Sequence, residues 1–180
     1  VASSRGLGDV YKRQVHRSIP KDPLSIAFIN AGKEAGYKET DDISGYCQEG
    51  FGIFDRTVFK GERWSTTRGY LDPVRDRKNL TIITKALVCK LILENNKATG
   101  VCFKDNKNKI FNVKSNKEVI LCAGAVGSPH ILMLSGIGPK DHLKSMGINL
   151  IADMPGVGQN LQDHPDFMIK YKCLKPVTLW

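Results

Sequence analysis

The sequence predicts a mixed α/β fold that contains a parallel sheet and a β-meander. An apolar run at residues 118–122, followed by small residues and a Ser-Pro pair, predicts a strand buried on both faces, a tight turn and a helix. Short apolar segments at 87–93, 98–103 and 110–113 are separated by polar turns and predict the meander. Apolar residues at three- and four-residue spacing predict an amphipathic helix over 23–36.

The remaining elements are predicted from their capping and turn residues. The first helix has Pro23 at its start and Gly36 past its end, which is the usual asymmetry of helix termini. Further expected elements are an ordered loop at 40–63 with short strands near 50–54, a helix at 65–76 capped by Ser65 or Thr66, a strand at 80–84, a helix from Pro129, a helix at 139–146, a strand at 148–152 and a loop at 155–164.

The composition indicates a globular protein with a strongly basic surface. The 180 residues are 41% hydrophobic, enough for one sizeable core, and the net charge is +9. The 27 basic residues are scattered without a run of five like charges, so we expect a solvated surface, with nucleic-acid binding as the alternative. No apolar run approaches the roughly 18 residues of a membrane span.

Cysteine and histidine usage predicts neither a metal site nor a redox dithiol. The five cysteines have no CxxC spacing, which favours reduced thiols and an intracellular compartment. They are Cys47, Cys89, Cys102, Cys122 and Cys173. Of the four histidines, we expect His16, His130 and His142 to be surface or structural residues. His164 is the better candidate for a functional residue. We expect it to have a structural role in its loop rather than a direct role in catalysis.

The ends of the chain lead us to expect an internal part of a longer protein. The first residue is Val1, and residues 3–14 resemble translated cloning or sequencing adapter, so 1–14 are excluded from the fold prediction. The other end, at Trp180, completes neither a helix nor a strand in this reading.

The most specific motif is the segment 124–138, Gly-Ala-Val-Gly-Ser-Pro-His-Ile-Leu-Met-Leu-Ser-Gly-Ile-Gly. The turn at 123–125 would let a nucleotide contact the backbone at a helix N-terminus, but a ligand-free packing turn explains these residues equally well. The motif resembles the second signature of the glucose-methanol-choline (GMC) oxidoreductase family. Other stretches resemble the family in the same order, including 48–52, 61–66, 117–121 and 155–164, and the resemblance covers about 20–180.

The resemblance implies a flavoprotein in which an FAD-binding domain with a parallel sheet is interleaved with a substrate domain built on an antiparallel sheet. We expect 15–75 to belong to the substrate or cap region, 76–158 to part of the FAD-binding domain, and 159–180 to the start of re-entry into the substrate domain. The residues expected to bind FAD are Val88, through its backbone at the adenine end, Ala123, Gly124, Asp163 and His164.

The resemblance is closest to the members of the family that oxidise choline. It implies oxidation of choline to betaine aldehyde by hydride transfer to the flavin, as in glycine betaine synthesis, with a quinone-type electron acceptor. The family's GxGxxG turn and its late catalytic His are expected outside this chain, so we assign no catalytic residue and expect the chain alone to be inactive. Another alcohol or sugar oxidoreductase of the family, and a non-catalytic fragment, remain alternatives. Peripheral attachment to a bacterial or mitochondrial inner membrane is a further expectation.

Overall fold

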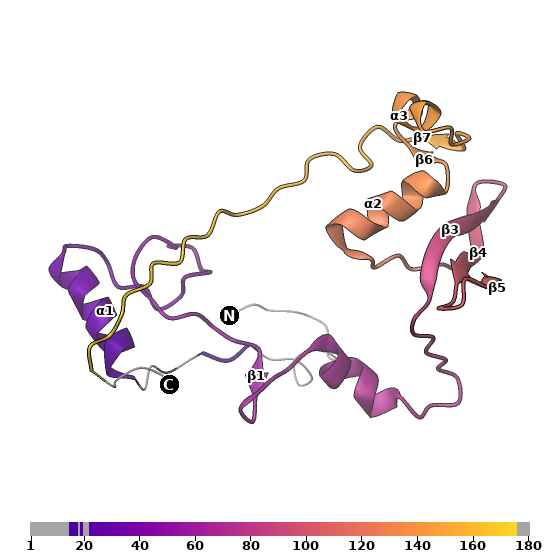
Figure 1. The fold of residues 1–180 in the computed structure, drawn as a ribbon. Helices are drawn as coiled ribbons and strands as arrows, with labels where there is room; N and C mark the ends of the chain where they lie inside the picture. The colour runs from indigo at the N-terminus through magenta and orange to yellow at the C-terminus, as the bar shows by residue number, and fades with distance from the viewer. Residues whose placement is uncertain (1–14, 18, 20–21, 176–180) are drawn as a thin grey trace. The chain divides into compact units, whose positions relative to one another are not determined.

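The chain forms two compact units in a computed structural model that describes residues 15–17, 19 and 22–175. One unit comprises 1–81 with 168–180, and the other comprises 82–167 (Figure 1). The predicted adapter at 1–14 lies outside the described residues. Helices and strands occur together in both units, which confirms the mixed class.

The first unit begins with helix α1 (Pro23–Glu34), as predicted. The Asp22 carboxylate caps it, accepting hydrogen bonds from the Ser25 backbone N–H at 2.8 Å and from the Ser25 hydroxyl at 2.7 Å. Beyond the C-terminal end, Gly36 has a φ of +88°, a conformation that glycine adopts without a Cβ penalty. The sequence therefore specifies both ends of this helix correctly.

The rest of the first unit differs from the prediction. The short strands expected near 50–54 are reduced to one bridge between Glu39 and Phe51, and the strands form instead at β1 (Val58–Phe59) and β2 (Glu62–Arg63). The predicted helix at 65–76 is a π-helix, η1 (Thr67–Leu71), followed by a 3₁₀ turn, η2 (Asp72–Val74). Pro73 cannot donate the backbone N–H bond of a regular α-helix, and the chain forms the 3₁₀ turn at this residue.

The second unit contains the predicted antiparallel meander. Strands β3 (Leu87–Glu94), β4 (Lys97–Lys104) and β5 (Ile110–Lys114) lie in that order in one sheet. Asn95 and Asn96 turn the chain with φ angles of 51° and 63°, and the Asp105 carboxylate accepts backbone N–H bonds from the next turn. The turns form for the reason on which the prediction was based. The short polar side chains of Asn and Asp tolerate a positive φ or accept hydrogen bonds from the backbone.

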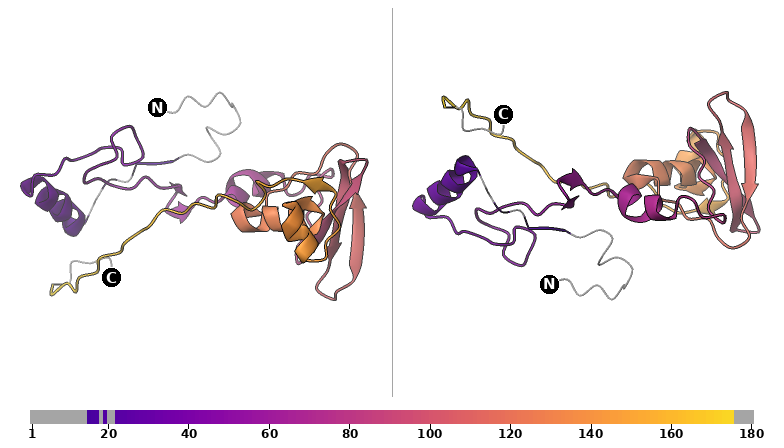
Figure 2. Two further views of the ribbon diagram at one scale, coloured as in Figure 1. Left: turned by 90° about the horizontal axis from the view of Figure 1, so that it is seen from above. Right: turned by 90° about the horizontal axis from the view of Figure 1, so that it is seen from below.

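Helix α2 (Gly124–Leu134) packs beside β3 (Figure 2). The prediction that the helix begins at Pro129 is wrong, because Pro129 lies inside it. Ser128 is therefore not the N-cap of the helix. Its hydroxyl accepts a hydrogen bond from the Ala123 backbone N–H at 3.0 Å. A single proline removes one backbone hydrogen bond and can bend a helix without ending it. Five residues of α2 therefore precede Pro129 in the helix.

A short parallel pair follows α2. Strands β6 (Ile137–Gly138) and β7 (Ala152–Asp153) flank helix α3 (Lys140–Ser145). The predicted helix at 139–146 is confirmed, whereas the strand predicted at 148–152 is short and displaced toward 153. Leu143 of α3 is fully buried, and with Leu91, Cys102 and Phe103 it makes up the buried apolar core.

The two predicted strands at 80–84 and 118–122 are not strands in the described structure. Ile120 is 75% exposed, although the run around it is apolar. An apolar run becomes a strand only when neighbouring strands take its backbone N–H and C=O groups. The described residues place no such neighbours beside it, and β6–β7 is the one pair of parallel strands among them.

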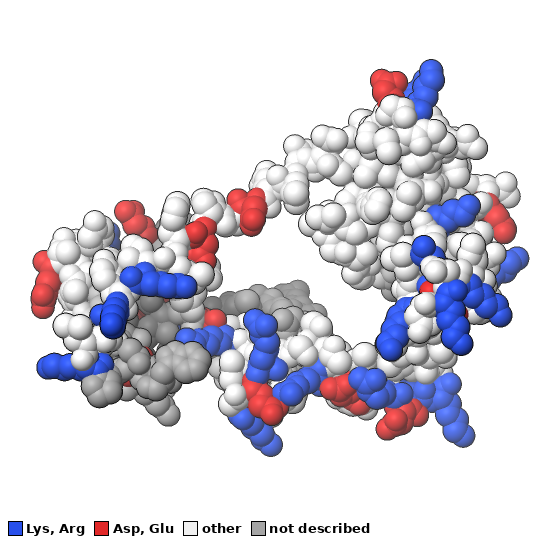
Figure 3. All heavy atoms as spheres, in the orientation of Figure 1, with Lys and Arg blue, Asp and Glu red and all other residues white. Residues whose placement is uncertain are grey.

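Charges are distributed over both units. In the view of Figure 3, Lys and Arg side chains lie on each unit with Asp and Glu between them. Several form exposed ion pairs, such as Lys33 Nζ with Glu39 Oε2 at 2.7 Å and Arg75 with Asp72 at 2.8 Å. This distribution supports a solvated surface.

Candidate functional site

A hollow of about 770 Å³ lies in the second unit between helix α2 and the loop that follows β7. The helix contributes one wall and residues 158–162 contribute the other. From α2 the lining side chains are Ala125, Val126, Pro129, His130 and Met133.

The parallel pair β6–β7 positions the loop beside the helix. The Met154 N–H donates to the Gly138 carbonyl at 3.0 Å, which fixes the start of the loop to β6. Gly158 then turns with a φ of +77°, and a Cβ placed there would lie 3.5 Å from Met133 Cε and 3.8 Å from Pro129 Cβ. The loop therefore reaches the wall of α2 at a glycine, where its backbone approaches closely.

The hollow combines an apolar wall with amide groups and a helix N-terminus. Val126, Pro129 and Met133 are apolar, while Gln159, Asn160 and Gln162 provide amide donors and acceptors. No side chain caps the N-terminus of α2, so the first backbone N–H groups are available to an anionic ligand. His130 is the one titratable side chain among the lining residues.

None of the five predicted FAD contacts lines this hollow, although four of them adjoin its lining segments in the sequence. Ala123 and Gly124 directly precede the lining part of α2, and Asp163 and His164 directly follow the lining loop. All four are exposed, and the Asp163 carboxylate accepts the His164 N–H at 2.9 Å. Val88 lies elsewhere, in β3 opposite Phe103, and it is not among the lining residues.

Sequence reasoning missed the helix face that lines the hollow. Val126, His130 and Met133 recur at the four- and three-residue spacing of one helix face, a signal that could have identified them. The interpretation of Pro129 as the first helical residue concealed that spacing. The approach of 158–162 to α2 has no comparable signal, because it depends on the two-residue pair β6–β7.

The described residues offer no second chemical centre. No group of three His, Cys, Asp or Glu side chains there could hold a metal ion. His16 pairs with Arg56 at a backbone bridge, and His142 is exposed on α3. All the cysteines of this part of the chain are free thiols. None of its helices has the length and apolar character required to cross a membrane.

Comparison with known proteins gives the same result as the motif. The chain is 51% identical over 158 residues to the oxygen-dependent choline dehydrogenase of Pectobacterium carotovorum subsp. carotovorum (strain PC1), covering 87% of this chain and 28% of that protein. The chain therefore spans little more than a quarter of the length of this relative.

Solved structures agree. An FAD-dependent oxidoreductase from Chaetomium thermophilum matches with a TM-score of 0.71 and 38% identity, covering 78% of this chain and 25% of that one. A formate oxidase matches with a TM-score of 0.72 and 29% identity, covering 83% and 26%. Residues 11–166 match the family described as GMC oxidoreductase. The resemblance found in the signature segment is thus confirmed, and the chain belongs to the GMC oxidoreductase family.

Proposed function

We propose that this chain is part of a longer FAD-dependent enzyme that oxidises choline to betaine aldehyde. The observation that carries the proposal is the 51% identity, over 87% of the chain, to a relative named as a choline dehydrogenase. The hollow beside α2 supports it, because one of its two walls belongs to the signature segment 124–138.

The residues of the hollow fit an FAD molecule. Its lining contains no acidic side chain, and the N-terminus of α2 favours negative charge such as a pyrophosphate. Nothing lies within 4 Å of the position of a Cβ on Gly124, so a ligand could approach the backbone there. Ala123, Gly124, the loop 158–162 and the adjoining Asp163 and His164 would hold the cofactor, which supplies the hydride acceptor. Val88 would contribute backbone contacts at the adenine end.

The division into domains follows the same proposal. Residues 76–158, which include the meander and α2, would form part of the FAD-binding domain. Residues 15–75 would belong to the substrate or cap region, and 159–180 would begin the return to it.

The electron acceptor and the location belong to the same proposal. We propose a quinone-type acceptor and peripheral attachment to a membrane, where such quinones dissolve. The relative in Pectobacterium is named as oxygen-dependent, so dioxygen is the competitor to compare. Equal turnover with dioxygen alone and with an added soluble quinone would contradict the quinone assignment.

The substrate is tested by expressing the longer protein and measuring turnover with choline, glucose and simple alcohols at saturating FAD. We expect choline to have the highest kcat/KM. A higher kcat/KM for glucose or a simple alcohol would overturn the substrate assignment and leave the family unchanged.

The location of the cofactor is tested with a charge placed in the hollow. Val126 is 72% exposed on the lining face of α2, so Val126→Asp adds a carboxylate without filling the core. Repulsion from the FAD phosphates should weaken FAD binding about tenfold or more. Met146→Asp is the matched control, since Met146 is 64% exposed and lies outside the hollow. Equal FAD affinities of the two variants would contradict this site.

A further inference from the structure

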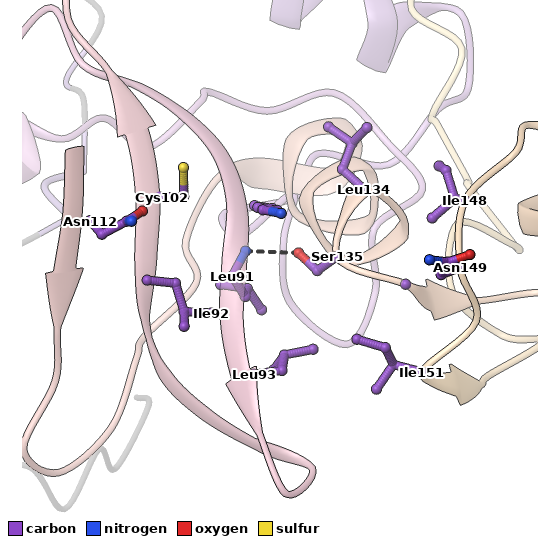
Figure 4. A pocket seen from close by; sticks show the side chains of 12 residues that line it. Leu91, Ile92, Leu93, Cys102, Asn112, Leu134, Ser135, Ile148, Asn149 and Ile151 are labelled. Carbon is purple, nitrogen blue, oxygen red and sulfur yellow. Dashed lines mark hydrogen bonds between the residues drawn. The ribbon is translucent and has the colours of Figure 1, made fainter. Parts of the chain in front are cut away.

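Ser135, at the C-terminal end of α2, is the one polar residue buried in the described structure, with 6% of its surface exposed. Its hydroxyl accepts the Leu91 backbone N–H at 2.8 Å (Figure 4) and donates to the Ile131 carbonyl at 2.6 Å. The first bond joins residues 44 positions apart, and the second lies within the helix. One side chain thus connects α2 directly to strand β3.

The Leu91 N–H lies at an open edge of the meander. Strand β3 pairs only with β4 in its sheet, so its other edge is free to bond something else. The Ser135 hydroxyl takes the place that the carbonyl of a further strand would occupy. A buried N–H without this acceptor would carry the full cost of lost hydration.

A hollow adjoins this bond. A hollow of about 550 Å³ lies at the junction of β3 with the end of α2. Leu91 and Leu93 line it from the strand, Leu134 and Ser135 from the helix, and Asn149 and Ile151 from the segment before β7 (Figure 4). The hydrogen bond of Ser135 therefore lies beside space that no side chain fills.

The two ends of α2 differ in how they are held. At the C-terminal end, the Gly136 carbonyl accepts backbone bonds from Ile151 at 2.8 Å and Ala152 at 3.1 Å, next to the bond of Ser135. At the N-terminal end, residues 123–126 are exposed and no side chain caps the helix. The direction in which this free end points depends on the attachments at the other end.

We propose that Ser135 is a positioning residue, which holds α2 against β3 and thereby keeps the N-terminal half of the helix at the hollow beside 158–162. The consequence for FAD rests on the proposed function. The attachment itself does not, because it follows from the hydrogen bonds and burial of this chain. Ser135 touches no part of the candidate cofactor hollow and acts through α2.

The test uses Ser135→Ala, Ser135→Thr and Ser145→Ala in the longer protein, with amide hydrogen exchange and FAD affinity as readouts. Ser135→Thr keeps the hydroxyl, and the adjoining hollow has room for the added methyl group. Ser145→Ala is the control, because the Ser145 hydroxyl bonds the His142 carbonyl at 2.8 Å in an exposed helix end. Peptides covering 86–93, 123–134 and 139–147 report on β3, α2 and α3.

We expect Ser135→Ala to accelerate exchange in 86–93 and 123–134 and to weaken FAD binding, each about tenfold, while 139–147 stays unchanged. Ser135→Thr should restore both readouts, and Ser145→Ala should change neither. Unchanged exchange at 123–134 in Ser135→Ala, or failure of Ser135→Thr to restore it, would overturn the positioning role. If Ser135→Ala does not fold, wild-type exchange and FAD affinity in Ser135→Thr support the role, and their loss overturns it. Absence of FAD binding by the wild type would instead refute the proposed function, and the exchange data would still decide the role of Ser135.

Discussion

Gly32 illustrates how one missing side chain organises the first unit. It is the buried residue of α1, and a Cβ built on it would lie 2.5 Å from Cγ of Phe51. The Phe51 ring also lies 5.1 Å from the ring of Phe28 and 5.4 Å from that of Tyr37, measured between centroids. The absence of a side chain at Gly32 thus lets the loop dock on α1 through one aromatic ring.

Gly32→Ala should lower the free energy of unfolding of the first unit by about 1–3 kcal/mol, the usual cost of overpacking. Alanine alone would favour the helix by roughly 1 kcal/mol, so a net loss identifies the contact with Phe51 as the cause. Urea denaturation followed by circular dichroism measures the change. The double variant Gly32→Ala/Phe51→Leu should recover part of the loss, and an unfolding midpoint at or above the wild-type value in the single variant would contradict the contact.

At the scale of an element, α1 is expected to respond to acid at its cap. The Ser25 hydroxyl, and then the Ser25 backbone N–H, hold the pKa of the Asp22 carboxyl below its ordinary range. Because the folded pKa is lowered, the contribution of the cap is complete above the unfolded pKa and is lost as pH falls through the folded pKa. The amide chemical shift of Ser25 should therefore titrate below about pH 4.

Asp22→Asn is the matched control for this acid transition. Asparagine is an equally good cap and does not ionise in this range, so the Ser25 amide should not titrate in that variant. The same acid transition in both proteins would show that another group is responsible.

The elements that the sequence predicted correctly are those that depend on their own residues. α1 has its capping aspartate and its terminal glycine, and the meander has Asn95-Asn96 and Asp105 at its turns. The run 118–122 failed because a parallel strand depends on neighbours from other parts of a chain. In the site, the signature segment identified the helix and the separate stretch 155–164 identified the loop, but only the structure shows that they face each other.

At the scale of the whole molecule, the chain holds one part of the proposed site. It spans 28% of the length of its relative in Pectobacterium, and residues 123–126 beside the hollow are exposed. A partial site offers few of the contacts that offset the entropy a ligand loses on binding. We therefore expect the 180-residue chain to bind FAD weakly and the proposed longer protein to bind it tightly.

The most direct measurement is the visible absorption spectrum of both proteins after incubation with FAD and desalting, before and after anaerobic addition of choline. The account predicts that the longer protein stays yellow and that choline bleaches its flavin band, while the 180-residue chain emerges colourless and shows no choline-dependent dye reduction. A colourless longer protein, a flavin that choline does not bleach, or a yellow 180-residue chain that turns over choline would contradict it.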